Sequence, residues 1–272
     1  TLSPETLGFD PEQLAERYRI ERSKRLRDDA ESQFIEVTND SAFANEYMAH
    51  DPYNGIIERE PIKDLREVIV IGGGWVGMMT ATRLIQSGVT DVRIVESGTD
   101  FGGTWYWNRY PGIACDVEAY SYLPLLDEMG YFPKMKFASG FEIFEYCQKM
   151  AERFGFYDHC LFHTEVTDAS WDDAAERWIV STNRGDVMRA KHLVLANGVL
   201  TTPRLARIAG MDKFQGKSFH TARWDYDVDL KGKRVGIIGT GATAVQVVPE
   251  IAKMAGQLHV FQRSASTIDV RD

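Results

Sequence analysis

The sequence predicts an α/β fold built around two strand–helix–strand units, because the same local pattern occurs twice along the chain. The apolar run VIVI (68–71) leads into GGGWVG (72–77), and the run VGII (235–238) leads into GTGATA (239–244). A strand that ends in a glycine turn and opens directly into a helix is typical of Rossmann-like folds. Both units are therefore expected to bind a dinucleotide pyrophosphate at the start of their helix.

Each unit has a second apolar run that ends beside a charged residue. From Gly72 to Glu96 is 24 positions (96 − 72), and from Gly239 to Arg263 is also 24 (263 − 239). A carboxylate at this place accepts hydrogen bonds from free ribose hydroxyls, whereas an arginine pairs with a 2′-phosphate. The pattern therefore predicts FAD at the first turn, NADP at the second, and flavin redox chemistry. In the alternative, Arg263 is a solvated surface cation and the second unit binds NAD or nothing.

Composition narrows the class of protein. The 272 residues are 44% hydrophobic and 26% charged, with a net charge of −9, which argues against a nucleic-acid surface and against anionic membranes. No apolar run approaches the roughly 20 residues that span a bilayer. Cys115, Cys147 and Cys160 are far apart, which predicts free thiols and a reducing, cytoplasmic compartment. The six histidines show no metal-ligand spacing, so no metal site is expected.

Four segments are expected along the chain. Residues 1–65 form an arm with a helix from Pro11 to about Ala30, which could pack on the main body or on a second subunit as a homodimer, or remain a mobile tail. Residues 66–202 form the FAD-binding domain, 203–232 a linker, and 233–272 the start of an NADP-binding domain. One such unit of about 40 residues cannot cover both faces of its own strands. We therefore expect the chain to be the first part of a longer polypeptide, or to need a partner chain.

Within the FAD-binding domain, periodicity predicts three features. A helix is expected over about 76–87 and another over about 141–154, and residues 164–197 read as a β-meander with polar turns near 172 and 184. Between them lies the loop DFGGTWYWNRYPG (100–112), whose glycines permit close approach to a ligand and whose aromatics could wall a ring system. The alternative for this loop is an aromatic-rich part of the core.

The linker contains FQGKSFHTARWD (214–225). A lone histidine such as His220 is more often structural than catalytic, and His220 and Trp224 would share one face if the segment were helical. The pattern of Phe214, Gly216, His220, Trp224 and Asp225 nevertheless resembles the fingerprint of type I Baeyer–Villiger monooxygenases. The loop 102–112 with Cys115-Asp116 is similar to that family's flavin loop, and the segment 196–203 is similar to the one that closes its FAD lobe.

This resemblance covers about residues 66–268 and implies an activity. NADPH would reduce a bound FAD, and one oxygen atom of O₂ would be inserted beside a ketone carbonyl to give an ester or lactone. The alternatives are an N- or S-oxygenating flavin monooxygenase and a catalytically silent flavin-binding module. The longer arm resembles the amino-terminal extension of hydroxyacetophenone-type members.

The resemblance also implies residue roles, carried over by position. Gly72, Gly74 and Gly77 would bind the FAD pyrophosphate and Glu96 its ribose, while Gly103, Thr104, Trp105, Tyr106, Trp107, Asp116 and Tyr122 approach the flavin and Val166 the adenine. Thr240, Gly241, Ala242, Thr243, Ala244, Val245 and Gln246 would hold the NADP phosphates, with Arg263 and Ser264 on the 2′-phosphate. Asp116 would hold an active-site arginine, which the resemblance places beyond residue 272, and His220 would couple cofactor movement to catalysis. The second turn has Ala242-Thr243-Ala244 where the family more often has two serines and a glycine, but alanine at the third site still permits tight packing.

Overall fold

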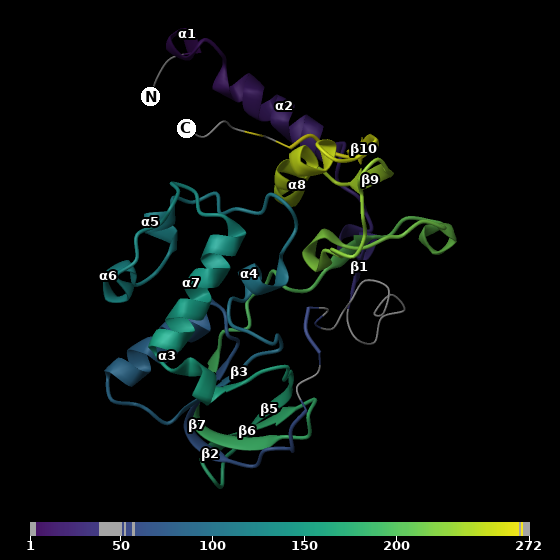
Figure 1. The fold of residues 1–272 in the computed structure, drawn as a ribbon. Coiled ribbons are helices and arrows are strands. Elements are labelled where there is room, and N and C mark those ends of the chain that lie inside the picture. Colours follow the sequence, from purple (N-terminus) through teal and green to yellow (C-terminus); the bar gives the residue numbers. More distant parts are fainter. Residues whose placement is uncertain (1–3, 38–50, 52, 56–57, 267, 269–272) are drawn as a thin grey trace.

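The computed structural model describes residues 4–37, 51, 53–55, 58–266 and 268. A six-stranded sheet in the order β4-β3-β2-β7-β6-β5 forms the main body, and a smaller unit with two strands and a helix lies beside it (Figure 1). The main strands are β2 (Leu65–Ile71), β3 (Val92–Val95), β4 (Cys160–Leu161), β5 (Val166–Asp172), β6 (Arg177–Thr182) and β7 (Val187–Leu195).

The sheet is part parallel and part antiparallel. β2 pairs in parallel with both β3 and β7, and β3 pairs in parallel with β4. β5, β6 and β7 form an antiparallel meander, with a register shift between Val166 and Asp168. The predicted α/β fold with its β-meander is therefore confirmed.

Alternating side chains place the strand β2 between two cores. Val68 and Val70 belong to the larger apolar cluster, which also contains residues of α3 (Trp75–Gln86) and α7 (Gly140–Arg153). Ile69 points to the opposite face and packs with buried residues of β6 and β7. Because successive side chains of a strand face opposite sides, one face of β2 packs with residues of α3 and α7, and the other packs with side chains of the meander strands. The helices predicted over 76–87 and 141–154 match α3 and α7 within one or two residues.

The arm is joined to the linker by a strand pair that the sequence reading missed. β1 (Phe34–Glu36) pairs antiparallel with β8 (Arg204–Ala206), and the Val37 N–H donates to the Pro203 carbonyl at 2.9 Å. The expected long helix is shorter, because α2 (Pro11–Ser23) ends before Asp28 and Asp29, whose carboxylates disfavour a helix C-terminus. The remaining short elements of the arm are α1 (Pro4–Leu7) and the 3₁₀ turn η1 (Ala30–Gln33).

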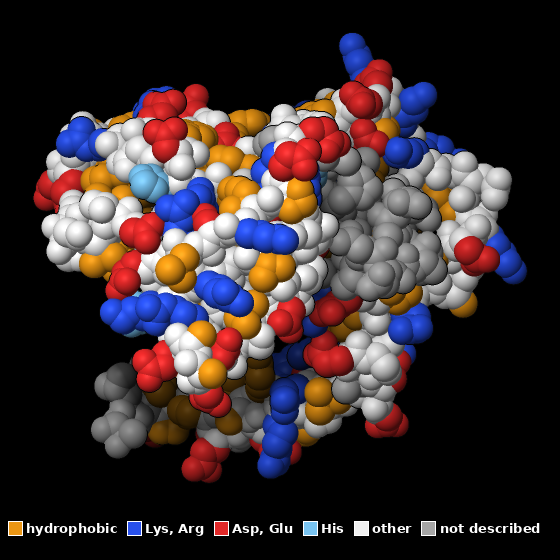
Figure 2. All heavy atoms as spheres, turned by 90° about the horizontal axis from the view of Figure 1, so that it is seen from below, with side chains coloured by type: hydrophobic (Ala, Val, Ile, Leu, Met, Phe, Trp, Pro, Cys, Tyr) orange, Lys and Arg blue, Asp and Glu red, His pale blue; other side chains and the backbone are white. Residues whose placement is uncertain are grey.

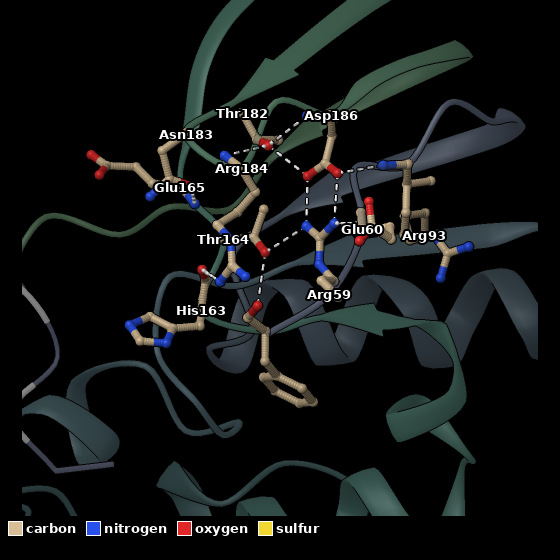
Figure 3. Close-up of polar contacts among 12 residues, drawn as sticks. Arg59, Glu60, Arg93, His163, Thr164, Glu165, Thr182, Asn183, Arg184 and Asp186 are labelled. Carbon is tan, nitrogen blue, oxygen red and sulfur yellow. Dashed lines mark hydrogen bonds and ion pairs between the residues drawn. The ribbon is translucent and has the colours of Figure 1, made fainter. Parts of the chain in front are cut away.

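The segment just before β2 is fastened to the meander by a buried ion pair. Arg59 donates from both terminal nitrogens to the two carboxylate oxygens of Asp186, each at 2.6 Å, in the turn between β6 and β7 (Figure 3). Asp186 also accepts from the Ile62 N–H at 2.7 Å and the Thr182 hydroxyl at 2.5 Å, and Arg59 donates to the Thr164 hydroxyl at 3.0 Å. Burial by itself would raise the pKa of Asp186, but Arg59 and the other donors outweigh it and lower the pKa to about 2.

The smaller unit has the predicted strand–helix–strand order. β9 (Arg234–Ile238) and β10 (Gln257–Phe261) pair in parallel, with α8 (Ala242–Ala252) between them along the chain. Val247 and Ile251 of α8 are fully buried and join the larger core of the main body. Six short elements complete the described chain: α4 (Thr104–Trp107), α5 (Ala119–Tyr122), α6 (Leu126–Met129), η2 (Phe156–His159) and, in the linker, η3 (Met211–Lys213) and η4 (Thr221–Arg223).

The surface carries both signs of charge despite the net charge of −9. On the face seen from below, Lys and Arg side chains are interspersed with Asp and Glu side chains (Figure 2). Within the described ranges, no helix is both long enough and apolar enough to cross a membrane. The same residues contain no cluster of three or more His, Cys, Asp or Glu side chains suited to a metal ion.

Candidate functional site

The first glycine turn has a backbone that only glycine can supply. Gly72 has φ +110°, and its N–H donates to the Val95 carbonyl at 2.8 Å, which ties the turn to the end of β3. A Cβ at Gly72 would lie 2.3 Å from the Ala196 carbonyl oxygen, and a Cβ at Gly77 would lie 1.9 Å from the Gly72 carbonyl oxygen. Strand and helix therefore approach each other as closely as a dinucleotide turn requires.

The same turn touches the aromatic loop. A Cβ at Gly103 would lie 2.8 Å from the Gly74 Cα, so the two glycines pack backbone against backbone. Gly74 is the N-cap of α3, and no described side chain caps its first turn by a hydrogen bond. The first N–H groups of α3 have no partner within the helix, and Gly74 has no Cβ to block access to them. Together they form a cradle that fits a phosphate group. FAD therefore fits the residues on this side of the molecule.

Glu96 lies where the sequence places it, directly after β3, and is 4% exposed. Its carboxylate accepts from the Gly73 N–H at 2.6 Å and from the Gly98 N–H at 2.7 Å. Burial raises the pKa of Glu96, while these backbone donors counteract that rise. Val166, which the resemblance places at the adenine, begins β5 and is partly buried against the cluster that contains Ile69.

The residues predicted to approach the flavin are brought together in part. The indole N–H of Trp105 donates to the Tyr122 hydroxyl at 2.8 Å, and their rings meet edge to face. Gly103 and Thr104 lie at the start of α4, beside the glycine turn. Asp116 is exposed and lies in the loop between α4 and α5. This set could line one side of a flat ring system.

Tyr106 and Trp107 have a different environment from Trp105. Both side chains are buried, and the Tyr106 hydroxyl donates to the carboxylate of Asp51, in the arm. The hydroxyl of Tyr53, also in the arm, donates to the Trp107 carbonyl at 3.0 Å. Neither contact could be predicted from the sequence, because Asp51 and Tyr53 each lie about fifty residues from their partner along the chain. Hydrogen bonds from the arm therefore hold the aromatic loop in place.

The linker supports the loop from another direction. The guanidinium of Arg223 lies 4.3 Å from the centre of the Trp107 ring, and the residue is only 3% exposed. Burial lowers the pKa of Arg223 to about 10. Arg223 also donates to the Thr201 carbonyl at 2.9 Å, which links the linker to the end of the segment 196–203.

His220 caps a turn and is held neutral. Its Nδ1 accepts from the Ala222 N–H at 3.1 Å, at the start of η4. Burial, followed by the positive charge of Arg223, lowers the pKa of His220 to about 4. His220 and Trp224 would share one face only in a helix, and this segment is not one, because η4 is a three-residue 3₁₀ turn and both residues flank it in extended conformation. Trp224 instead joins the larger core.

The second glycine turn repeats the first. Gly239 has φ +109°, and its N–H donates to the Phe261 carbonyl at 2.9 Å. Gly241 is the N-cap of α8, again without a hydrogen-bonding cap from a described side chain. The Thr240 hydroxyl donates to the Ser264 carbonyl at 3.1 Å, so the turn and the segment after β10 lie side by side. This second cradle fits the pyrophosphate of NADP.

The remaining residues predicted for NADP are spread around α8. Arg263 is exposed, and its guanidinium donates to the side chain of Gln33 in the arm. Ala242 and Val245 are exposed on the first turns of α8, Thr243 is partly buried and Ala244 is buried. The side chain of Gln246 hydrogen-bonds to the aromatic loop instead of lying open.

The equal spacing of 24 residues does not correspond to equal places in the two units. Ile71 is opposite Val95 in the first strand pair, and Ile238 is opposite Phe261 in the second. Glu96 therefore follows its strand directly, whereas Arg263 comes one residue later, after Gln262. The second unit has one residue fewer between its turn and the end of its second strand, which counting along the sequence could not reveal.

Comparison with known proteins agrees with this geometry. A model of the family described as flavin-binding monooxygenase-like matches residues 65–271. A Baeyer-Villiger monooxygenase of Streptomyces coelicolor is 50% identical over 281 residues, which cover 99% of this chain and 45% of that protein. A polycyclic ketone monooxygenase of Thermothelomyces thermophilus is 41% identical, with 98% of this chain and 45% of that protein covered.

Solved structures give the same result. The structure of polycyclic ketone monooxygenase from Thermothelomyces thermophila has a TM-score of 0.86 at 39% identity and covers 94% of this chain and 45% of that one. Cyclohexanone monooxygenase from Rhodococcus sp. Phi1 bound to NADP⁺ has a TM-score of 0.71 at 36% identity, covering 75% and 39%. The chain thus spans less than half the length of these relatives, and it belongs to the flavin-binding monooxygenase-like family.

Proposed function

We propose that the protein with this chain is an FAD- and NADPH-dependent Baeyer–Villiger monooxygenase, which converts a ketone and O₂ into an ester or lactone. The observation that carries the proposal is the pair of matching glycine turns, one beside the buried Glu96 and one beside Arg263 and Ser264. Relatives at 41–50% identity that are named for this reaction or for ketone oxidation support the substrate class.

In this proposal the chain's own residues bind and orient. The starts of α3 and α8 supply backbone N–H groups for the two pyrophosphates, and Glu96 accepts from the ribose of FAD. Arg263 and Ser264 bind the 2′-phosphate, although Arg263 must then exchange its bond with Gln33 for the phosphate. FAD, when bound, supplies the redox and oxygen chemistry. Asp116 and His220 keep the roles that the family resemblance implies.

Three further expectations remain proposals. The boundaries 1–65, 66–202, 203–232 and 233–272 are kept, and the contacts of β1 and Arg59 support an arm that packs on its own chain. A homodimer through the arm is tested by the molecular mass in solution. A cytoplasmic location is supported by the three free cysteines.

The test is anaerobic mixing of the flavin-loaded, full-length protein with NADPH or NADH while the flavin absorbance is recorded. We expect NADPH to bleach the flavin at least about tenfold faster than NADH at equal, subsaturating concentration, because a charge-assisted hydrogen bond is worth roughly 1.5–3 kcal/mol. Addition of O₂ and a cyclic ketone should then yield a lactone. Oxygenation of an amine or thioether without lactone would indicate an N- or S-oxygenating enzyme, and absence of any oxygenation would indicate a flavin-binding module.

A further inference from the structure

Gln246 connects the helix of the second unit to the aromatic loop of the first. Its Oε1 accepts from the Tyr110 hydroxyl at 2.9 Å and from the Ala114 N–H at 3.4 Å. Its Nε2 donates to the Ala114 carbonyl at 2.8 Å. The amide thus pairs with both backbone groups of Ala114, much as a neighbouring strand would, and also holds a tyrosine side chain.

The loop backbone lies directly on α8 at this point. Gly112 has φ +81°, and a Cβ there would lie 2.6 Å from the Gln246 carbonyl oxygen and 2.9 Å from the Glu250 Cγ. Tyr110 is 7% exposed, and burial raises its pKa, while a hydrogen bond from Thr243 counteracts this. Contact this close leaves little freedom for the loop to shift against the helix.

The two partners of this contact lead to two different sites. In one direction, Gln246 is five residues after Gly241, in the helix that opens from the second glycine turn. In the other direction, Ala114 is two residues before Asp116 and two residues after the end of the aromatic loop 100–112. The amide therefore lies on a short, rigid path between the proposed NADP cradle and the loop proposed to contact the flavin.

We propose that Gln246 is a positioning residue, which fixes the second nucleotide unit against the flavin loop so that NADPH is oriented for hydride transfer, and that its side chain is not a ligand of the nucleotide. This inference rests on the proposed function. Correct placement of two reactants contributes strongly to rate, and a displacement of about 1 Å can cost about 100-fold. Losing the amide contact should therefore affect the reduction step more than the binding of NADPH.

The test compares Gln246→Met with Gln86→Met in flavin-loaded, full-length protein. Methionine keeps the length of the side chain but cannot form the three hydrogen bonds. Gln86 is an exposed glutamine near the end of α3 and is the matched control. We measure the rate constant of flavin reduction at saturating NADPH, the dissociation constant of NADPH, and the flavin absorbance spectrum.

For Gln246→Met we expect the saturating reduction rate to fall about tenfold or more, with the NADPH dissociation constant changed by less than about threefold. Tyr110→Phe removes one of the three bonds, so its rate should fall by a smaller factor, and this variant provides the test should Gln246→Met fail to fold. An unchanged saturating rate in the folded variants would overturn the proposal, and so would weakened NADPH binding at a normal saturating rate. If the unmodified protein is not reduced by NADPH, the proposed function itself fails.

Discussion

The two strand–helix–strand units have the same turn but different surroundings. Gly72 and Gly239 have φ values of +110° and +109°, and the N-cap residues Gly74 and Gly241 have ψ values of −169° and −172°. Yet a Cβ on Gly72 would collide with the backbone of Ala196 at 2.3 Å, whereas no described atom lies within 4 Å of one on Gly239. Local sequence sets the turn, and distant parts of the chain set how tightly it is enclosed.

The largest loss of stability should come from a substitution at the third glycine position of the first turn, and the same position of the second turn provides the comparison. Gly77→Ala would place a Cβ 1.9 Å from the Gly72 carbonyl oxygen, so we expect more than the roughly 1–3 kcal/mol typical of overpacking, together with loss of bound flavin. The second turn already has an alanine at the same place, and Ala244→Gly should cost only about 1 kcal/mol through helix propensity. Thermal unfolding and flavin content measure both. Equal destabilisation by the two changes would contradict the difference in enclosure.

A smaller loss of stability should follow when the ion pair between Arg59 and Asp186 is broken. Asp186→Asn should lower the free energy of unfolding by about 3 kcal/mol, near the low end for a buried ion pair, because 18% of the Arg59 side chain remains exposed. The matched control is Glu36→Gln, which removes the Arg204 ion pair, 52% exposed on both sides, and should cost less than about 1 kcal/mol. Urea unfolding at neutral pH gives both values. Similar losses would show that the buried Arg59–Asp186 pair stabilises the fold no more than the exposed Arg204–Glu36 pair.

The lowered pKa of Asp186 predicts how the stability of the fold changes at low pH. Its pKa is lowered in the folded protein from the ordinary 3.8 to about 2, so the unfolded chain binds more protons between these values. The stability from Asp186 is therefore fully present above about pH 4 and is lost as the pH falls toward about 2. Unfolding free energy followed over this range should decline more steeply in the unmodified protein than in Asp186→Asn; parallel curves would refute this assignment.

The smallest effect on stability is expected for Arg263, and comparison with Glu96 distinguishes the two charged residues of the dinucleotide sites. Glu96→Gln should cost about 1–3 kcal/mol, because an amide N–H₂ would face the Gly73 or Gly98 N–H in place of a carboxylate oxygen. Arg263→Gln lies on the surface and should change stability by less than about 0.5 kcal/mol, yet lower the preference for NADPH over NADH by about tenfold to a hundredfold. Calorimetry measures the changes in stability, and the ratio of kcat/KM for NADPH to kcat/KM for NADH measures the coenzyme preference. A preserved NADPH preference in Arg263→Gln would remove Arg263 from the site.

Sequence reasoning recovered what depends on neighbouring residues. The glycine turns, the helices α3 and α7 and the β-meander follow from periodicity and turn chemistry, and Glu96 follows from its place after β3. It could not recover the contacts of Asp51, Arg223 and Gln246, because each joins segments whose distance in space is set by the whole fold. The one-residue offset of Arg263 was hidden for a similar reason, since spacing along the chain does not define register between strands.

The pairing of β1 with β8 has a practical consequence for anyone who shortens the chain. Deletion of the residues before 38 would leave β8 with a row of unsatisfied backbone donors and acceptors beside the linker. Such a bare strand edge recruits other chains, so a shortened version would tend to self-associate even with both glycine turns intact. Expression boundaries are therefore better placed ahead of Phe34 than at the start of the main sheet.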